Sequence, residues 1–195
     1  VNRLVLAVAG LLLVAGCGAV PVPAFTSGPP EPAPPVLAAV ADPVQVVIPA
    51  LRVTDEVVTV GLCETKAPPR CEKGIGEMEL PEVTETGWYR LVPRPGVLGR
   101  AILAGHVDWK GTPGSFKQLG TLRPCDLIRT TDAAGIEREW RVYDVHQIPK
   151  RDYAARAVPL LFDDSRGPEL ALVTCSGAVS GGEYSDNTIV RARLE

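Results

Sequence analysis

The sequence predicts a mostly β domain that folds as a closed or nearly closed barrel of mixed strands. From residue 44 onward, short β-branched runs alternate with turn signals, and the chain contains 19 glycines and 19 prolines. Seven or eight such runs fit between residues 44 and 195. Helical patterns are weak, with short candidates only at 115–119 and 154–161. Many short strands without helices to cover them favour a barrel.

The expected strands share β-branched residues and are separated by turn chemistry. Turn signals occur at 94–96 (Arg-Pro-Gly), 111–114 (Gly-Thr-Pro-Gly), 132–135 (Asp-Ala-Ala-Gly) and 165–168 (Ser-Arg-Gly-Pro). In chain order, we expect strands at 44–53, 56–62, 99–107, 125–132, 137–148, 169–175 and 187–194.

The first 17 residues have the layout of an export signal. Arg3 precedes an apolar run, and the segment 14–17 (Val-Ala-Gly-Cys) resembles the lipobox in which a bacterial lipoprotein receives its lipid on the cysteine, here Cys17. The alternative is an uncleaved signal anchor, because the apolar run continues through Val22 and is barely long enough to span a bilayer. Both interpretations place the chain at the extracytoplasmic face of the membrane, held by a lipid or a helix.

A proline-rich linker follows the signal. Residues 18–43 combine many prolines with small residues, which favours an extended polyproline II spacer over a packed core. We therefore expect three parts: the signal at 1–17, the linker at 18–43 and a catalytic domain at 44–195.

Composition and motif content give no support for nucleic acid, metal or phosphate binding. The net charge of −3 gives no reason to expect a nucleic acid partner. No group of His, Cys, Asp or Glu has the spacing of metal ligands, and the sequence contains no phosphate-binding glycine loop. We expect no cofactor and no metal, and a monomer.

Two strand ends carry the candidate chemistry. Cys175 follows the apolar run 170–174, and His106 follows the run 101–105. A cysteine and a histidine at strand ends are the minimum for thiol nucleophilic catalysis, in which the imidazole accepts and returns a proton. Taken alone, a cysteine such as Cys175 is more commonly a buried structural thiol, and a histidine such as His106 is more commonly a satisfied surface or core residue.

The remaining polar candidates are less specific. The other of the two histidines, His146, lies in the middle of an expected strand and is interpreted as structural. Arg191 and Arg193 lie on one face of the last strand by alternation, where an arginine would stabilise an oxyanion or would simply be a surface charge.

These residues together resemble the sortase family, in particular its class E/F branch. The resemblance covers the chain from about residue 44 to 194. It is carried by the opening strand 47–51 (Val-Ile-Pro-Ala-Leu), the segments 79–81 (Glu-Leu-Pro) and 87–89 (Gly-Trp-Tyr), the turn 94–99, the histidine motif 103–108 (Leu-Ala-Gly-His-Val-Asp), the Thr-Cys signature at 172–175, and 184–187 (Tyr-Ser-Asp-Asn) before the final strand.

The resemblance implies an eight-stranded barrel and a transpeptidase reaction. Cys175 would cleave an LPXTG-like sorting signal of a secreted protein between Thr and Gly. The acyl group would pass to an amine, typically of a peptidoglycan precursor, or to water. His106 would be the acid/base. The family arginine usually stands where this chain has Asn187 and Thr188, so Arg191, with Arg193 behind it, is taken for that role.

The other cysteines fit an extracytoplasmic domain. The chain has five cysteines, and Cys63 and Cys71 are close enough in sequence to form a disulfide. Cys125 is interpreted as a spare thiol that does not pair with Cys175. The segment 176–183 is expected to be a short Gly/Ser-rich loop.

Two other functions remain in view. An L,D-transpeptidase would carry its histidine two residues before the cysteine, whereas His106 and Cys175 are far apart in sequence. A catalytically degenerate barrel acting as a lipoprotein binding module is the second alternative.

Overall fold

The computed structural model describes residues 39–67, 70–71, 74–162 and 167–195. The predicted signal at 1–17 and most of the linker at 18–43 therefore lie outside the described residues. The barrel strands are β1 (Pro43–Ile48), β2 (Val53–Val60), β3 (Thr86–Tyr89), β4 (Gly99–Ala104), β7 (Leu127–Asp132), β8 (Glu137–Pro149), β9 (Pro168–Ser180) and β10 (Glu183–Leu194).

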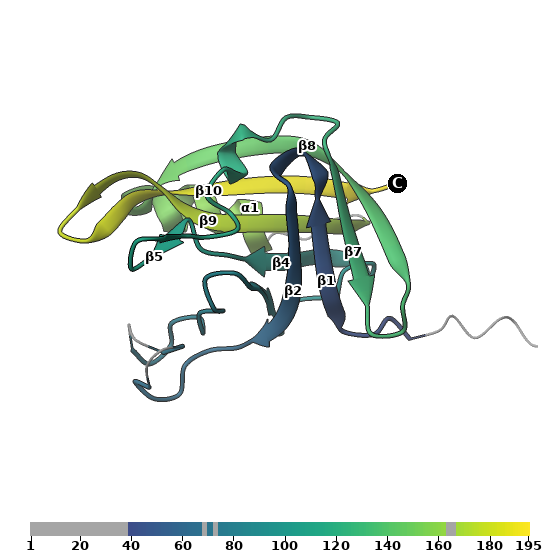
Figure 1. Ribbon diagram of the computed structural model, residues 1–195, viewed down its shortest axis with the longest axis horizontal. Helices are drawn as coiled ribbons and strands as arrows, with labels where there is room; N and C mark the ends of the chain where they lie inside the picture. Colours follow the sequence, from purple (N-terminus) through teal and green to yellow (C-terminus); the bar gives the residue numbers. More distant parts are fainter. Residues whose placement is uncertain (1–38, 68–69, 72–73, 163–166) are drawn as a thin grey trace, which may run out of the picture. The chain divides into compact units, whose positions relative to one another are not determined.

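Within the described part of the chain, these eight strands close into one barrel in the order β1-β2-β3-β4-β9-β10-β8-β7 (Figure 1). Two of the pairs, β2 with β3 and β4 with β9, are parallel, and the remaining pairs are antiparallel. The predicted mixed β-barrel is confirmed.

The strands around β9 are buried on both faces. Leu170 and Leu172 point into the barrel and belong to its main core, whereas Ala171 between them packs in a second cluster outside it. Leu161 of the single short α-helix of the described residues, α1 (Val158–Phe162), joins that outer cluster. Because successive side chains of a strand point to opposite faces, this alternation fixes which residues of β9 face outward.

The predicted helix candidates are close to the observed ones. The first, at 115–119, is mostly a hydrogen-bonded turn, and only its last residue belongs to the 3-10 turn at Leu119–Thr121. The second, at 154–161, corresponds to a π-helical turn at Tyr153–Ala157 that runs into α1.

The main differences from the sequence prediction concern three segments. The run 44–53 is not one strand, because Pro49 starts a 3-10 turn that separates β1 from β2. The four-residue β3 had too little alternation to be recognised as a strand. The expected loop at 176–183 is mostly strand, since β9 continues to Ser180 and β10 starts at Glu183. Gly181 and Gly182 both have positive φ, as a tight hairpin turn of this kind requires.

The β2–β3 connection and the β9–β10 hairpin lie on the same side of the barrel, with β5 (Asp108–Trp109) beneath the hairpin (Figure 1). The connection carries the disulfide between Cys63 and Cys71, which confirms that predicted pair. Cys125 and Cys175 are both free thiols, as expected. None of the described helices has the length and apolar character needed to cross a membrane.

Candidate active site

The parallel pairing of β4 with β9 brings His106 and Cys175 to the same edge of the barrel. Ala104 at the end of β4 is the register partner of Val173 in β9. Cys175 follows two residues later within β9, and His106 follows two residues after the end of β4, which runs in the same direction. Although they are far apart in sequence, the two residues come out side by side, as the sequence analysis expected of a thiol and its base.

Hydrogen bonds between Gly105 and two residues of β9 hold the segments of His106 and Cys175 together. The Gly105 amide donates to the Val173 carbonyl at 3.2 Å. The buried Thr174 hydroxyl donates in the opposite direction, to the Gly105 carbonyl, at 2.7 Å. Cys175 is therefore held beside the histidine segment by both main chain and side chain, and the strand β9 continues past it into the hairpin.

The loop after His106 folds back on the histidine backbone. The Phe116 amide donates to the His106 carbonyl at 3.0 Å, and the Gly114 amide donates to the Val107 carbonyl at 3.0 Å. A Cβ atom on Gly114 would lie 2.2 Å from the His106 carbonyl oxygen, so this close approach requires glycine. The Gly- and Pro-rich loop noted in the sequence thus fixes the position of His106.

The His106 ring is held by the β2–β3 connection. Its Nε2 lies 3.1 Å from the Pro81 carbonyl oxygen, and its ring packs against Trp109 with centroids 5.4 Å apart. A backbone carbonyl only accepts hydrogen bonds, so Nε2 carries the hydrogen. Nδ1 is then the nitrogen that can accept a proton from a thiol.

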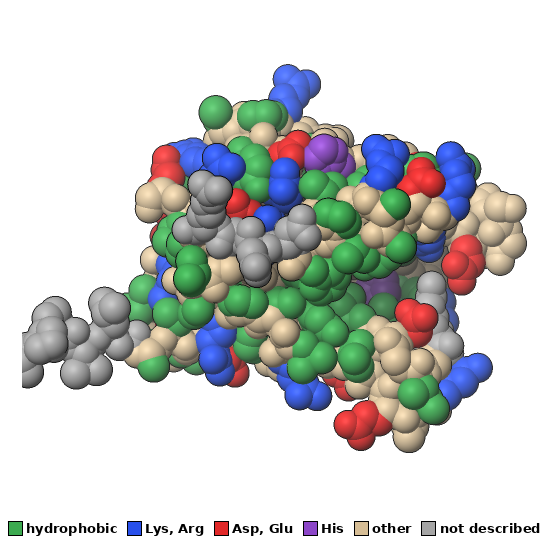
Figure 2. Space-filling model, turned by 180° about the vertical axis from the view of Figure 1, so that it is seen from behind, with side chains coloured by type: hydrophobic (Ala, Val, Ile, Leu, Met, Phe, Trp, Pro, Cys, Tyr) green, Lys and Arg blue, Asp and Glu red, His purple; other side chains and the backbone are tan. Residues whose placement is uncertain are grey.

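Both residues line one cleft with a volume of about 540 Å³. The β2–β3 connection contributes apolar side chains to its wall, among them Met78 and Leu80, and the β9–β10 hairpin contributes Tyr184. Figure 2 shows a recess on one face of the molecule, with hydrophobic side chains along its wall and a histidine within it. A concave, mainly apolar cleft with a few polar groups is the usual form of a ligand-binding site.

Tyr184 and Asp108 form a bridge at the rim of this cleft. The Tyr184 hydroxyl donates to an Asp108 carboxylate oxygen in a short hydrogen bond. That bond, together with partial desolvation, raises the pKa of Tyr184. The bridge joins the start of β10 to the segment that follows His106.

Asn187 also lines the cleft, and the sequence analysis assigned it no role. The antiparallel register of β9 with β10 pairs Asn187 directly with Cys175. Its Nδ2 donates to the Thr174 carbonyl at 3.3 Å. It stands where the sortase resemblance places the family arginine, and that correspondence is the signal by which the sequence could have pointed to it.

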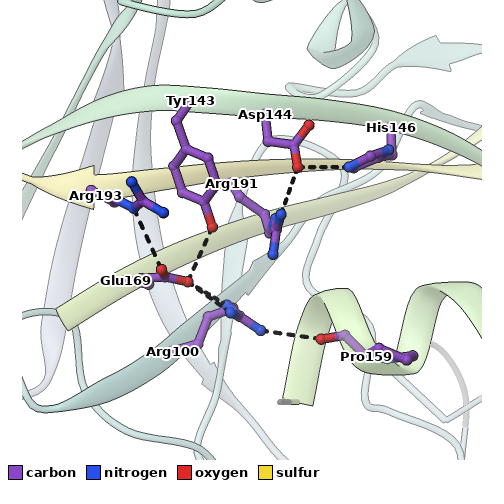
Figure 3. A network of polar contacts seen from close by, with 8 residues as sticks. All are labelled: Arg100, Tyr143, Asp144, His146, Pro159, Glu169, Arg191 and Arg193. Atoms are coloured by element: carbon purple, nitrogen blue, oxygen red, sulfur yellow. Dashed lines mark hydrogen bonds and ion pairs between the residues drawn. The ribbon is translucent and has the colours of Figure 1, made fainter. Parts of the chain in front are cut away.

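Arg191 does not join His106 and Cys175. It is the register partner of Ala171, four residues along β10 from Asn187, and it is not among the residues that line the cleft. Its guanidinium donates to Asp144 at 2.6 Å and lies over the Tyr143 ring at 4.9 Å. Figure 3 shows this arrangement on the outside of the barrel.

The same outer surface holds a buried ion-pair network. Arg100 and Glu169 interact at 2.7 Å, with only 6% and 12% of their side chains exposed, and Arg193 lies 3.7 Å from the same carboxylate (Figure 3). Burial alone would raise the pKa of Glu169, but the bonds from Arg100 and Tyr143 outweigh it and hold the pKa below its ordinary value.

His146 belongs to this network and not to the cleft. Its Nε2 lies 2.7 Å from Asp144, which also accepts from Arg191. Burial opposes ionisation of Asp144, but these two partners hold its pKa below the ordinary value. This placement agrees with the structural role that the sequence suggested for His146.

A free cysteine in β9 and a histidine just beyond β4 line one cleft on a closed mixed barrel, an arrangement that suits thiol chemistry. The sortase domain model matches residues 46–195, and the chain belongs to the sortase family.

Solved sortases share the fold. A sortase A lid mutant from Corynebacterium diphtheriae has 17% identity and a TM-score of 0.58, with 83% of this chain and 74% of that chain covered. Sortase C-1 from Actinomyces oris has 18% identity and a TM-score of 0.54, with 77% and 72% covered.

A third solved sortase is also similar in fold to this chain. The sortase D5 transpeptidase of Clostridium perfringens has 16% identity and a TM-score of 0.53, with 77% of each chain covered. No protein of curated function matches the sequence closely enough to count as a relative. The class E/F assignment stays a prediction.

Proposed function

We propose that this protein cleaves an LPXTG-like sorting signal between Thr and Gly and transfers the new acyl group to an amine. Cys175 is the nucleophile and His106 is the acid/base. The observation that carries the proposal is the parallel register of Ala104 with Val173, which sends the two side chains into one cleft. The Cys175 thiol is free and partly exposed, as a nucleophile must be.

The first half of the reaction forms a thioester. The Cys175 thiol gives its proton to His106, and the sulfur attacks the carbonyl carbon of the threonine. The resulting tetrahedral oxyanion collapses, the Thr–Gly bond breaks, and His106 returns the proton to the leaving glycine amine. The product is a thioacyl enzyme and a peptide that begins with glycine.

The second half releases the acyl group. An amine attacks the thioester carbonyl and loses its proton to His106, and the second tetrahedral species expels the Cys175 thiolate, which takes up the proton. We propose the amine of a peptidoglycan precursor or of another protein as acceptor, with water as a slow substitute. No cofactor takes part in this scheme.

We further propose that the domain works at the extracytoplasmic face of the membrane. The lipobox-like segment ending at Cys17 and the linker at 18–43 are the sequence basis, and a signal anchor is the alternative to the lipid. The Cys63–Cys71 disulfide supports an oxidising compartment. Labelling of cells with an alkyne fatty acid, compared between the native chain and Cys17→Ala, tests the lipid: loss of label in the variant is expected.

A product assay tests the function. The full chain, purified in detergent, is incubated with a panel of LPXTG-like peptides and an amine acceptor. The products are separated by chromatography and identified by mass spectrometry. We expect cleavage after Thr and an acyl–acceptor product that both disappear in Cys175→Ala and fall at least about a hundredfold in His106→Ala. Absence of both products across the panel, with Cys175 reduced and the protein folded, would favour the binding module instead.

A further inference from the structure

The proposed acyl transfer passes through two oxyanions, and an enzyme of this kind needs a hydrogen-bond donor close to the nucleophile. We propose that Asn187 is this donor, so that a neutral amide takes the position for which the sequence suggested Arg191. This inference rests on the proposed function, because it names the group that stabilises the charge developing beside Cys175.

The strand register places Asn187 next to the nucleophile. Asn187 in β10 is the direct antiparallel partner of Cys175 in β9. Directly opposed residues point to the same face of a sheet with Cβ atoms about 4.5–5.5 Å apart. Both residues line the cleft, so the carboxamide and the sulfur border the same space.

The orientation of the amide follows from its one bond to β9. Nδ2 donates to the Thr174 carbonyl at 3.3 Å, and a carbonyl cannot donate, so the nitrogen end of the amide must face β9. An amide nitrogen has two hydrogens. One of them binds Thr174, the residue before the nucleophile, and the second is available to an oxygen atom bound beside Cys175.

The arginine on the same strand is too distant for this role. Arg191 lies four residues further along β10, which is about 13 Å at the rise of a strand. Its guanidinium is also engaged by Asp144 at 2.6 Å. No arginine lines the cleft among the residues that the structure describes.

Two reactions of Cys175 distinguish a group that stabilises an oxyanion from a group that only changes the reactivity of the thiol. Acetylation by p-nitrophenyl acetate forms a tetrahedral oxyanion before p-nitrophenolate leaves. Alkylation by iodoacetamide displaces iodide directly and forms no oxyanion. Neither probe depends on a sorting motif, and intact-protein and peptide mass spectrometry report both rates at Cys175, with the exposed Cys125 as an internal reference.

In the full chain, we expect Asn187→Ala to lower the acetylation rate at Cys175 about a hundredfold and to change the alkylation rate less than about threefold. Asn187→Asp should lower acetylation at least as much, because a carboxylate has no hydrogen to donate. Retained alkylation in the same samples shows that the fold and the thiol are intact. Arg191→Lys, which keeps a cation beside Asp144, is the matched control and should leave both rates unchanged.

Three results would overturn the assignment: unchanged acetylation in Asn187→Ala, an equal fall of both rates, or wild-type Cys175 that acetylates no faster than Cys125. Failure of the proposed function looks different. An Asn187-dependent acetylation without cleavage of any sorting peptide would leave the donor assignment standing and reject the sorting reaction. Peptide cleavage that is insensitive to Asn187→Ala would reject the donor assignment and leave the sorting reaction standing.

Discussion

Thr174 and Gly105, the residues immediately before Cys175 and His106, are joined by a hydrogen bond from the threonine hydroxyl to the glycine carbonyl at 2.7 Å. The bond joins β9 to the residue that follows β4, directly before the two residues proposed to react. Thr174 is 5% exposed, so this contact is shielded from water. The Thr-Cys pair of the sequence signature therefore has a structural explanation: the threonine ties the segment that carries Cys175 to the segment that carries His106.

Replacing Thr174 with valine tests this explanation. Valine has the same shape but no hydroxyl, so the Gly105 carbonyl loses its donor and the two strand ends are free to shift. We expect turnover of a sorting peptide to fall about tenfold, because small misplacements of reacting groups are amplified in rate. We expect the free energy of unfolding to fall by about 1–3 kcal/mol. Steady-state kinetics and urea unfolding provide the two readouts.

Thr174→Ser is the matched control, since serine keeps the hydroxyl. Its turnover should stay within about threefold of wild type. Wild-type turnover in Thr174→Val would show that the hydroxyl does not set the catalytic geometry.

The disulfide should support the cleft from a distance. The Leu80 amide donates to the Arg70 carbonyl next to Cys71, and the following residue, Pro81, accepts from His106. We therefore expect the double change Cys63→Ser and Cys71→Ser to raise KM, since Met78 and Leu80 wall the cleft, and to lower kcat/KM about tenfold. The loss in stability should be about 2–3 kcal/mol for a loop of this length.

Cys125→Ser is the control for the disulfide, because that thiol is free and exposed. It should leave kinetics and stability unchanged. Equal kcat/KM values for the native protein and the double serine variant would mean that the connection holds its position without the cross-link.

Arg191 should contribute to stability and not to chemistry. Arg191→Met removes the partner of Asp144 in a partly buried pair, and we expect a lower melting temperature, with a loss of about 3 kcal/mol. The rate of Cys175 acetylation per folded molecule should stay within about twofold, since Arg191 is about 13 Å along the strand from Asn187. A fall of more than tenfold in folded Arg191→Met would restore the arginine to the active site.

The lowered pKa of Glu169 leads us to expect a specific change of stability with acid. Its pKa in the folded protein is held below the ordinary value of 4.5, so the folded state binds fewer protons there than the unfolded chain does. The stabilisation is complete above that ordinary value and is lost as the pH falls through the lower folded-state pKa. Glu169→Gln should therefore be less stable at neutral pH and should lose less stability on acidification. An equal loss of unfolding free energy on acidification in the native protein and in Glu169→Gln would contradict this.

The sequence was sufficient for the barrel, and it placed His106 and Cys175 after apolar runs that the structure shows as buried strands. β-branched runs and turn residues report strand content locally, and the apolar runs before His106 and Cys175 mark where buried strands emerge from the core. At Pro49 the strand prediction was wrong although the signal was present, because a proline cannot donate a ladder hydrogen bond and argues against a continuous strand.

The register between strands could not be obtained in this way. Asn187, Ile189 and Arg191 all face outward by alternation, so periodicity alone does not identify the one that meets Cys175. Only the pairing of β9 with β10 does so, and it selects Asn187. The continuation of β9 beyond Cys175 was missed for a related reason: residues 176–180 pair with β10 but lie outside the apolar core, so they lack the pattern of a buried strand.

The most direct test of the account is the mass of the intact protein after brief exposure to a sorting peptide without an acceptor amine. We expect an added mass equal to the peptide up to its threonine, located on Cys175 by digestion, absent in Cys175→Ala and discharged by hydroxylamine. A folded, reduced protein that gains no such mass with any peptide of the panel, or that cleaves the peptide equally well as Cys175→Ala, would contradict it.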